Sequence, residues 1–75
     1  MDRYKNLSGG SNVFSYAIGD DRITVQFKDG STYLYTNAKT GMRNIDQMKK
    51  LALQGRGLNS FINTNVRKLY EAKLR

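Results

Sequence analysis

The sequence predicts an α+β domain: a three-stranded antiparallel β-meander followed by two α-helices packed on one face of the sheet. Three observations indicate this β-β-β-α-α order. Residues 13–36 alternate apolar and polar side chains as strands do, residues 45–70 place apolar side chains at helical spacing, and no Pro interrupts either pattern. At 75 residues the chain is expected to form one domain with a thin core.

Residues 1–10 are expected to be a flexible N-terminal lead-in, and the domain is expected to span residues 11–75. The run Ser8-Gly9-Gly10-Ser11 has the small and polar composition of a flexible stretch and marks the end of this lead-in. The next segment, from Val13 to Ile18, is predicted to be a strand that places Phe14, Tyr16 and Ile18 on one face.

Residues 22–28 alternate most cleanly, and the strand that they predict turns Ile23, Val25 and Phe27 toward the core. The segment Lys28-Asp29-Gly30 then predicts a hairpin turn into a third strand over residues 31–36. The number of residues in this turn decides which side chains of the third strand face the core, because a shift of one residue exchanges the two faces.

Two registers of this hairpin are open. A two-residue turn pairs Val25 with Leu34 and leaves Tyr33 and Tyr35 on the polar face. A three-residue turn pairs Val25 with Tyr33 and turns both tyrosines toward the core. The three-residue turn is favoured because Gly30 suits its left-handed position, and because two rings are then buried instead of one leucine.

The second half of the chain predicts two helices. The first begins near Asn44, where the sequence approximates a capping box, and ends at Gly55. The second starts its apolar stripe at Leu58 and is expected to run on to Arg75. A kink or a late start is expected within it, at the weak helix formers Asn63, Thr64 and Asn65.

Composition and charge limit the classes of function that the chain can have. The chain has 13 Lys and Arg against 6 Asp and Glu, so its net charge is 13 − 6 = +7, which favours a polyanionic partner. It has no His or Cys, which excludes Ser-His-Asp and Cys-His catalysis and the usual zinc sites. The only carboxylates close together in the sequence, Asp20, Asp21 and Asp29, fall in hairpin turns, so no enzyme activity, metal or cofactor is expected.

Location follows from what the chain lacks. No apolar run approaches the roughly 20 residues of a membrane span, so no membrane insertion is expected. No export signal is visible at the start, so a cytoplasmic location is expected.

Six basic residues on or near the predicted helices are candidates for contacts with a phosphate backbone: Arg43, Lys49, Lys50, Arg56, Arg67 and Lys68. They either form one basic surface or remain separate solvated cations, and pairing of Glu71 with a basic residue four positions away would dilute them. Tyr33 and Tyr35 either stack on unpaired bases or belong to the core, according to the hairpin register. Gly55-Arg56-Gly57 is either an anion-binding turn or a helix stop.

An ordered set of residues carries a family resemblance: Ser11-Asn12-Val13, Tyr16, Ile23, Val25, Phe27, Gly30, Tyr33-Leu34-Tyr35, Gly57, Phe61-Ile62-Asn63, Val66-Arg67 and Tyr70. This set resembles the KTSC domain, which is named for the C-terminal domain of some bacterial lysyl-tRNA synthetases and also occurs as small stand-alone bacterial proteins. The most recognisable mark of the family is a central Tyr-x-Tyr. The resemblance covers residues 11–70. The chain departs from the pattern in its Leu between the tyrosines, its lack of a Val-Pro step and its longer predicted last helix.

The resemblance implies a non-catalytic domain that binds RNA or single-stranded nucleic acid. The alternative is a protein-interaction module or a homodimer, with a monomer favoured. Its interface would be an exposed apolar patch, for which the candidates are Leu34, Met42, Leu53 and Leu74.

Overall fold

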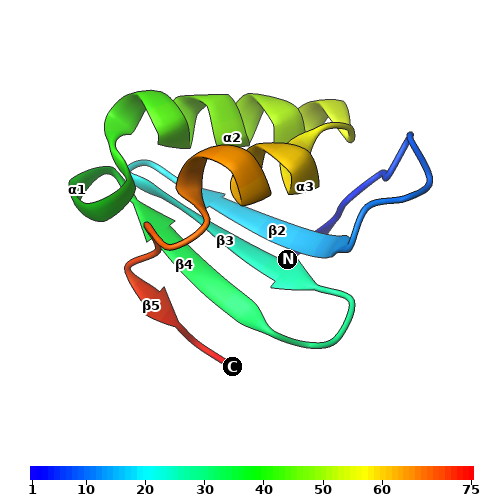
Figure 1. Ribbon diagram of the computed structural model, residues 1–75, viewed down its shortest axis with the longest axis horizontal. Helices are drawn as coiled ribbons and strands as arrows, with labels where there is room; N and C mark the ends of the chain where they lie inside the picture. Colours follow the sequence, from blue (N-terminus) through cyan, green and yellow to red (C-terminus); the bar gives the residue numbers. More distant parts are fainter.

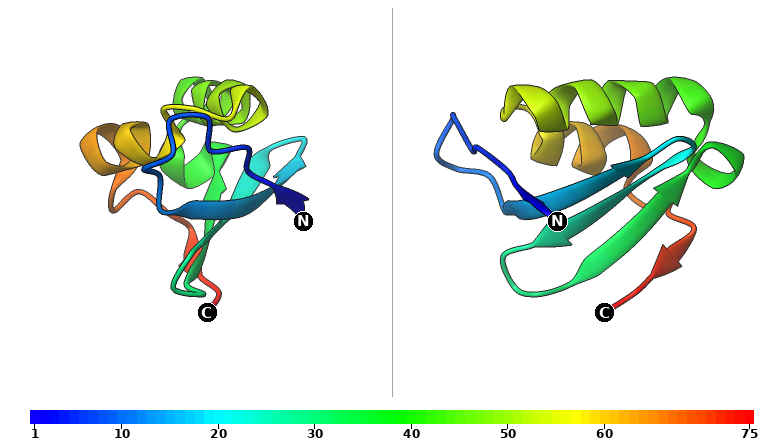
Figure 2. Two further views of the ribbon diagram at one scale, coloured as in Figure 1. Left: turned by 90° about the vertical axis from the view of Figure 1, so that its right-hand side faces the viewer. Right: turned by 180° about the vertical axis from the view of Figure 1, so that it is seen from behind.

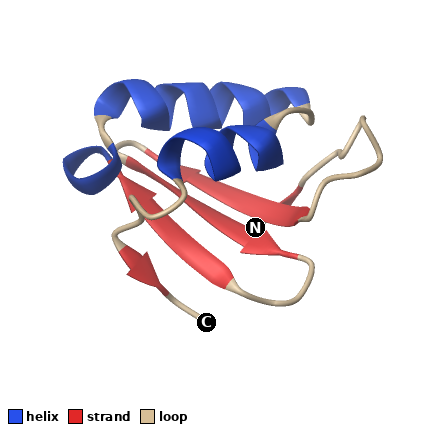
Figure 3. Ribbon diagram, viewed as in Figure 1, coloured by secondary structure: helices blue, strands red, loops and turns tan.

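A computed structural model describes residues 1–75 and contains one antiparallel sheet with helices on a single face (Figure 1, Figure 3). The strands follow one another across the sheet in chain order: β1 (Asp2–Arg3), β2 (Val13–Gly19), β3 (Arg22–Phe27), β4 (Thr32–Thr36) and β5 (Ala72–Lys73). The helical elements lie between β4 and β5 in the chain: α1 (Asn37–Thr40), α2 (Met42–Gln54), α3 (Leu58–Phe61) and the π-helix η1 (Ile62–Val66).

The α+β class is confirmed, but the predicted three-strand, two-helix layout is incomplete because the chain ends add the strands β1 and β5. Asp2 pairs with Tyr16 at one edge of the sheet, and Ala72 pairs with Leu34 at the other. Each of these strands has two residues, which is too short for an alternating pattern to register in the sequence.

The first residues also differ from the expected flexible lead-in. Tyr4 is only 4% exposed, and its hydroxyl accepts a hydrogen bond from the backbone N–H of Leu58. The N–H of Leu7 donates to the carbonyl of Gly55 at 2.7 Å, so the N-terminal loop reaches the end of α2 (Figure 2). The boundary predicted at residue 11 therefore excludes a strand and a core side chain that belong to the domain.

The hairpin register is the predicted three-residue one. Val25 pairs with Tyr33 and Ile23 pairs with Tyr35, while Gly30 has φ of 91°. Gly30 supplies the left-handed residue that this turn requires. The tyrosines of β4 therefore point to the helix-covered face of the sheet, and Leu34 points to the opposite face.

The shared face predicted for Phe14, Tyr16 and Ile18 is wrong at Phe14. The pairing of β2 with β3 is irregular between Val13 and Ser15, which is a β-bulge. The bulge inserts one extra residue, so Val13 joins Tyr16 in the core while Phe14 is 38% exposed. Ile18 remains opposite Ile23 but lies at the end of the strand, where it is also exposed.

Helix α2 ends at Gly55 as predicted, because Gly55 adopts the left-handed conformation that closes a helix. Its start differs from the prediction. The helix begins at Met42 after Gly41, and the side chain of Asn44 donates instead to the carbonyl of Thr40. The preceding turn, α1, is capped by Thr36, whose hydroxyl accepts from the N–H of Lys39.

The predicted helix over residues 58–75 is wrong beyond Val66. The side chains of Thr64 and Asn65 donate to the carbonyls of Ser60 and Phe61, where they compete with the helical hydrogen bonds. This competition accounts for the π-helical turn at the weak helix formers. The helix then ends, because later backbone groups bond elsewhere: the N–H of Glu71 donates to the carbonyl of Leu34.

The core lies between the sheet and the helices. Its members are twelve buried apolar side chains: Tyr4, Val13, Tyr16, Ile23, Val25, Tyr35, Ile45, Met48, Ala52, Leu58, Ile62 and Val66. Each layer contributes several of them, so the sheet and the helices bury one another. None of the helices is both long and apolar enough to cross a membrane.

Candidate functional site

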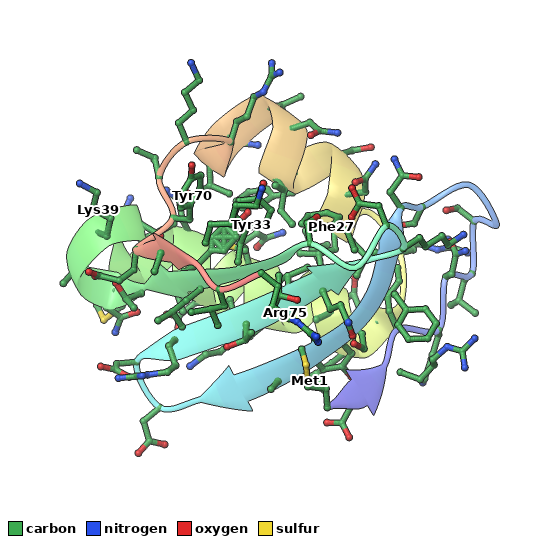
Figure 4. All side chains as sticks on the ribbon, turned by 90° about the horizontal axis from the view of Figure 1, so that it is seen from below. Met1, Phe27, Tyr33, Lys39, Tyr70 and Arg75 are labelled. Carbon is green, nitrogen blue, oxygen red and sulfur yellow. The ribbon has the colours of Figure 1, made fainter.

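A groove of about 720 Å³ lies between the β3–β4 turn and the helical segment that ends in η1 (Figure 4). This hollow, here named the aromatic groove, is lined by Asn12, Phe27, Lys28, Asp29, Ser31, Tyr33, Tyr35, Asn59, Ile62, Asn63, Arg67, Lys68 and Tyr70. Four of the eight residues proposed from the sequence are among them: Tyr33, Tyr35, Arg67 and Lys68. The groove therefore joins the tyrosines of the sheet to two cations from the end of the helical segment.

Tyr33 is the central ring of the groove. Its centroid lies 5.8 Å from that of Phe27 and 4.8 Å from that of Tyr70, in edge-to-face contacts. Figure 4 shows these three rings in a row along the side of the sheet that faces η1. Tyr33 is half-buried, and the ammonium of Lys73 lies over its ring, 5.8 Å from the ring centre. The neighbouring rings therefore hold Tyr33 in place beside a further cation.

Tyr35 lies deeper than Tyr33 and does not offer a stacking surface. It is only 1% exposed, so of the two alternatives open for it, stacking on bases or a place in the core, Tyr35 takes the core. Burial, with a smaller effect from the neighbouring Tyr33 and Tyr70, raises the pKa of Tyr35 to about 12. The buried ring forms the floor of the groove.

Three exposed cations border the groove, namely Lys28, Arg67 and Lys68, and none of them forms an ion pair. The one carboxylate in the lining belongs to Asp29. It accepts hydrogen bonds from the hydroxyl and the N–H of Ser31 at 2.6 and 2.9 Å, which lower its pKa. Three cations and one carboxylate leave the lining at 3 − 1 = +2.

Three asparagines add amide groups to the same lining. Asn12 and Asn63 are exposed and Asn59 is half-buried. In an α-helix, residues four apart are offset by about 40° around the axis. A π-helical turn contains more residues than an α-helical turn, so η1 reduces this angular offset. Asn59, Asn63 and Arg67 therefore follow one another along the same side of the helical segment.

The remaining predicted cations lie outside the groove: Arg43, Lys49, Lys50 and Arg56. The ammonium of Lys49 donates to the carbonyl of Asp20 in the β2–β3 turn at 2.8 Å. That turn lies at the opposite end of β3 from the groove (Figure 1). The six basic candidates therefore do not form a single surface, and Arg67 and Lys68 alone among them line the groove.

The segment Gly55-Arg56-Gly57 is a helix stop. Gly55 and Gly57 both have positive φ, and the N–H of Gly55 donates back to the carbonyls of Leu51 and Ala52. These bonds close α2, as expected of a helix stop. The proposed pairing of Glu71 with a basic residue four positions away is absent, and its carboxylate accepts from the hydroxyl of Thr36.

The four candidates for an apolar patch are scattered. Met42 and Leu53 are exposed near opposite ends of α2, and Leu34 lies on the face of the sheet away from that helix. Leu74 is exposed just beyond β5, the strand that pairs with Leu34, so these two lie near each other while Met42 and Leu53 belong to α2. The four candidates therefore do not all lie on one face.

Sequence reasoning did not propose several groove residues as site residues: Asn12, Lys28, Asn59, Asn63 and Tyr70. Lys28 was assigned to a turn and Tyr70 to an apolar helix stripe. One signal was present in the sequence. Asn59, Asn63 and Arg67 follow at intervals of four residues, the spacing of one helix face, and they carry no apolar side chain.

Comparison of the chain with protein-family models, curated proteins and solved structures found no match. Function is therefore inferred from the chemistry of the aromatic groove.

Proposed function

We propose that this protein is a small, non-catalytic module that binds RNA or single-stranded nucleic acid in the aromatic groove. The observation that carries the proposal is the meeting of three chemistries in one hollow: a half-buried aromatic ring at Tyr33, unpaired cations and side-chain amides. Single-stranded nucleic acid offers the complement of each, namely base faces, phosphates and base edges.

The energetic contributions are divided among these groups. A base stacked on an aromatic side chain contributes about 1–3 kcal/mol, and the open part of Tyr33 is available for this contact. Lys28, Arg67 and Lys68 supply charge for phosphates. An asparagine amide presents one donor and one acceptor, which suits the edge of an unpaired base.

The resemblance to the KTSC domain supports the same proposal. Within the Tyr-x-Tyr mark, Tyr33 borders the groove and Tyr35 lies in the core. One ring would then serve the ligand and the other the fold. We accordingly propose that the chain is a divergent member of this family and acts in the bacterial cytoplasm.

The first test is a titration with a labelled single-stranded RNA at a series of salt concentrations. The logarithm of the binding constant should fall with the logarithm of salt concentration at a slope of about −2 or steeper, since each neutralised phosphate of a single strand contributes about −0.7. The double variant Arg67→Gln and Lys68→Gln should make this slope shallower by about 1.4, because it removes two such contacts.

The matched control is the double variant Lys49→Gln and Lys50→Gln, which removes the same charge outside the groove. It should leave the affinity and the slope near those of the unmodified protein. An equal loss in both double variants would show that only the total charge matters, and would overturn the groove as the site. A response independent of salt would overturn the backbone contacts.

The ring can be tested separately from the charges. Tyr33→Phe keeps the stacking face and should retain binding, whereas Tyr33→Ala should weaken binding about tenfold at unchanged salt slope. The urea midpoint of each variant checks that it remains folded at the binding temperature. Equal binding by the folded Ala and Phe variants would contradict a stacking role.

A further inference from the structure

A second hollow, of about 450 Å³, lies beside the aromatic groove. This N-terminal hollow is lined by Arg3, Tyr4, Lys5, Asn6, Val13, Phe14 and Lys28. Lys28 also lines the aromatic groove, so the two hollows meet at this side chain. No residue of the N-terminal hollow other than Lys28 belongs to the groove.

Backbone hydrogen bonds hold this hollow in place. The N–H of Tyr4 donates to the carbonyl of Phe14 at 3.0 Å, and the N–H of Lys28 donates to the carbonyl of Asn12 at 2.8 Å. The side chain of Asn6 accepts from the N–H of Ser11 and closes the intervening loop. The cations of the hollow therefore project from a fixed backbone.

The lining of the N-terminal hollow has three cations and no carboxylate: Arg3, Lys5 and Lys28. The guanidinium carbon of Arg3 lies 4.4 Å from the centre of the Phe14 ring. This stacking orients the planar guanidinium while its N–H groups remain able to reach a phosphate. Phe14 is 38% exposed because of the β-bulge, so the bulge places an aromatic ring beside the cations.

We propose that the N-terminal hollow is a second subsite for the same strand. Arg3 and Lys5 would hold phosphates beyond the aromatic groove, and Lys28 would contact the phosphate between the two hollows. This inference rests on the proposed function and specifies its ligand: a single-stranded oligonucleotide that spans both hollows, in preference to a nucleotide that fills one.

The test compares two ligands on one variant. The double variant Arg3→Gln and Lys5→Gln should weaken binding of a long single-stranded RNA about tenfold and make its salt slope shallower by about 1.4. Binding of a dinucleotide, which fits within the aromatic groove, should remain unchanged. Arg3→Lys with Lys5→Arg preserves both charges and should restore the salt slope of the long strand.

The matched control is Arg43→Gln with Lys50→Gln, which removes the same charge from α2 and should change neither ligand's affinity. An unchanged affinity of the long strand for the Arg3 and Lys5 variant overturns the second subsite and leaves the groove standing. An equal loss for both ligands also overturns it, because a subsite beyond the groove cannot weaken a ligand that does not reach it. Failure of the unmodified protein to bind either ligand overturns the proposed function itself.

Discussion

The two ends of strand β3 carry similar numbers of charged residues but arrange them differently. At the β2–β3 turn the guanidinium of Arg22 pairs with Asp21 at 2.9 Å, and Lys49 donates to the backbone of Asp20. Two acidic and two basic side chains balance there. At the β3–β4 turn Asp29 is bonded to Ser31, and the neighbouring cations of the groove have no acidic partner.

This difference explains why the net charge of +7 could not locate a site. At the β2–β3 end of β3, Arg22 and Lys49 bond to the residues of the turn and face no aromatic ring. Cations at the groove end border Tyr33 and are free to meet a ligand. Where a cation lies in relation to acidic groups and open rings therefore matters more than how many cations the chain contains.

The largest expected effect is a loss of stability that differs between the two tyrosines of β4, one in the core and one in the groove. Tyr35→Ala should destabilise the domain by about 3–5 kcal/mol, because it leaves a cavity among buried side chains. Tyr33→Ala, at the half-buried position, should cost about half as much or less. Urea unfolding followed by circular dichroism measures both variants. Equal losses would remove the distinction between a core tyrosine and a groove tyrosine.

A smaller effect is expected on the pH dependence of the stability of the fold. The pKa of Tyr35 is raised to about 12 in the folded protein, above its usual value of 10.0. Between these two values the unfolded chain has lost the phenolic proton while the folded chain retains it, so stability should fall as pH rises. Below pH 10 this contribution is fully present. Tyr35→Phe should make the alkaline decline in the urea midpoint shallower, and an unchanged decline would contradict the buried phenol as its cause.

The smallest effect is expected at the far end of β3. Asp21 and Arg22 form an exposed pair, and exposed pairs contribute little because solvent and salt screen them. The double variant Asp21→Asn and Arg22→Gln should leave the thermal midpoint unchanged within error. It should also leave RNA affinity unchanged, whereas a loss of binding would extend the site beyond the groove.

Local signals predicted the parts of the fold that depend on neighbouring residues. Gly30 fixed the hairpin register, and Gly55 fixed the end of α2. The sequence did not predict the strands β1 and β5, because a two-residue strand is defined by its pairing partner and not by its own residue pattern. The end of the last helix was also not predicted, because it depends on a partner far away in the sequence. The N–H of Glu71 bonds to the carbonyl of Leu34 instead of continuing the helix.

The candidate site was half predicted. Tyr33, Arg67 and Lys68 were proposed from residue type and lie in the groove. Lys28 was assigned to a turn, and the part it plays in joining two hollows depends on packing between distant segments. Phe14 was expected on the same strand face as Tyr16 and Ile18, because the β-bulge that turns it outward leaves no mark in the alternation of residues.

The order of strands across the sheet has a consequence for how the chain folds. Strands β2, β3 and β4 are joined by tight turns, so they can pair through contacts close in sequence. Strand β5 must close a loop of more than thirty residues to reach β4, as Tyr33 pairs with Lys73. Closing a long loop costs chain entropy, so contacts between residues far apart in the sequence form slowly. The meander is therefore expected to form before the segment that carries Tyr70 docks on it, which makes the aromatic groove one of the last features to assemble.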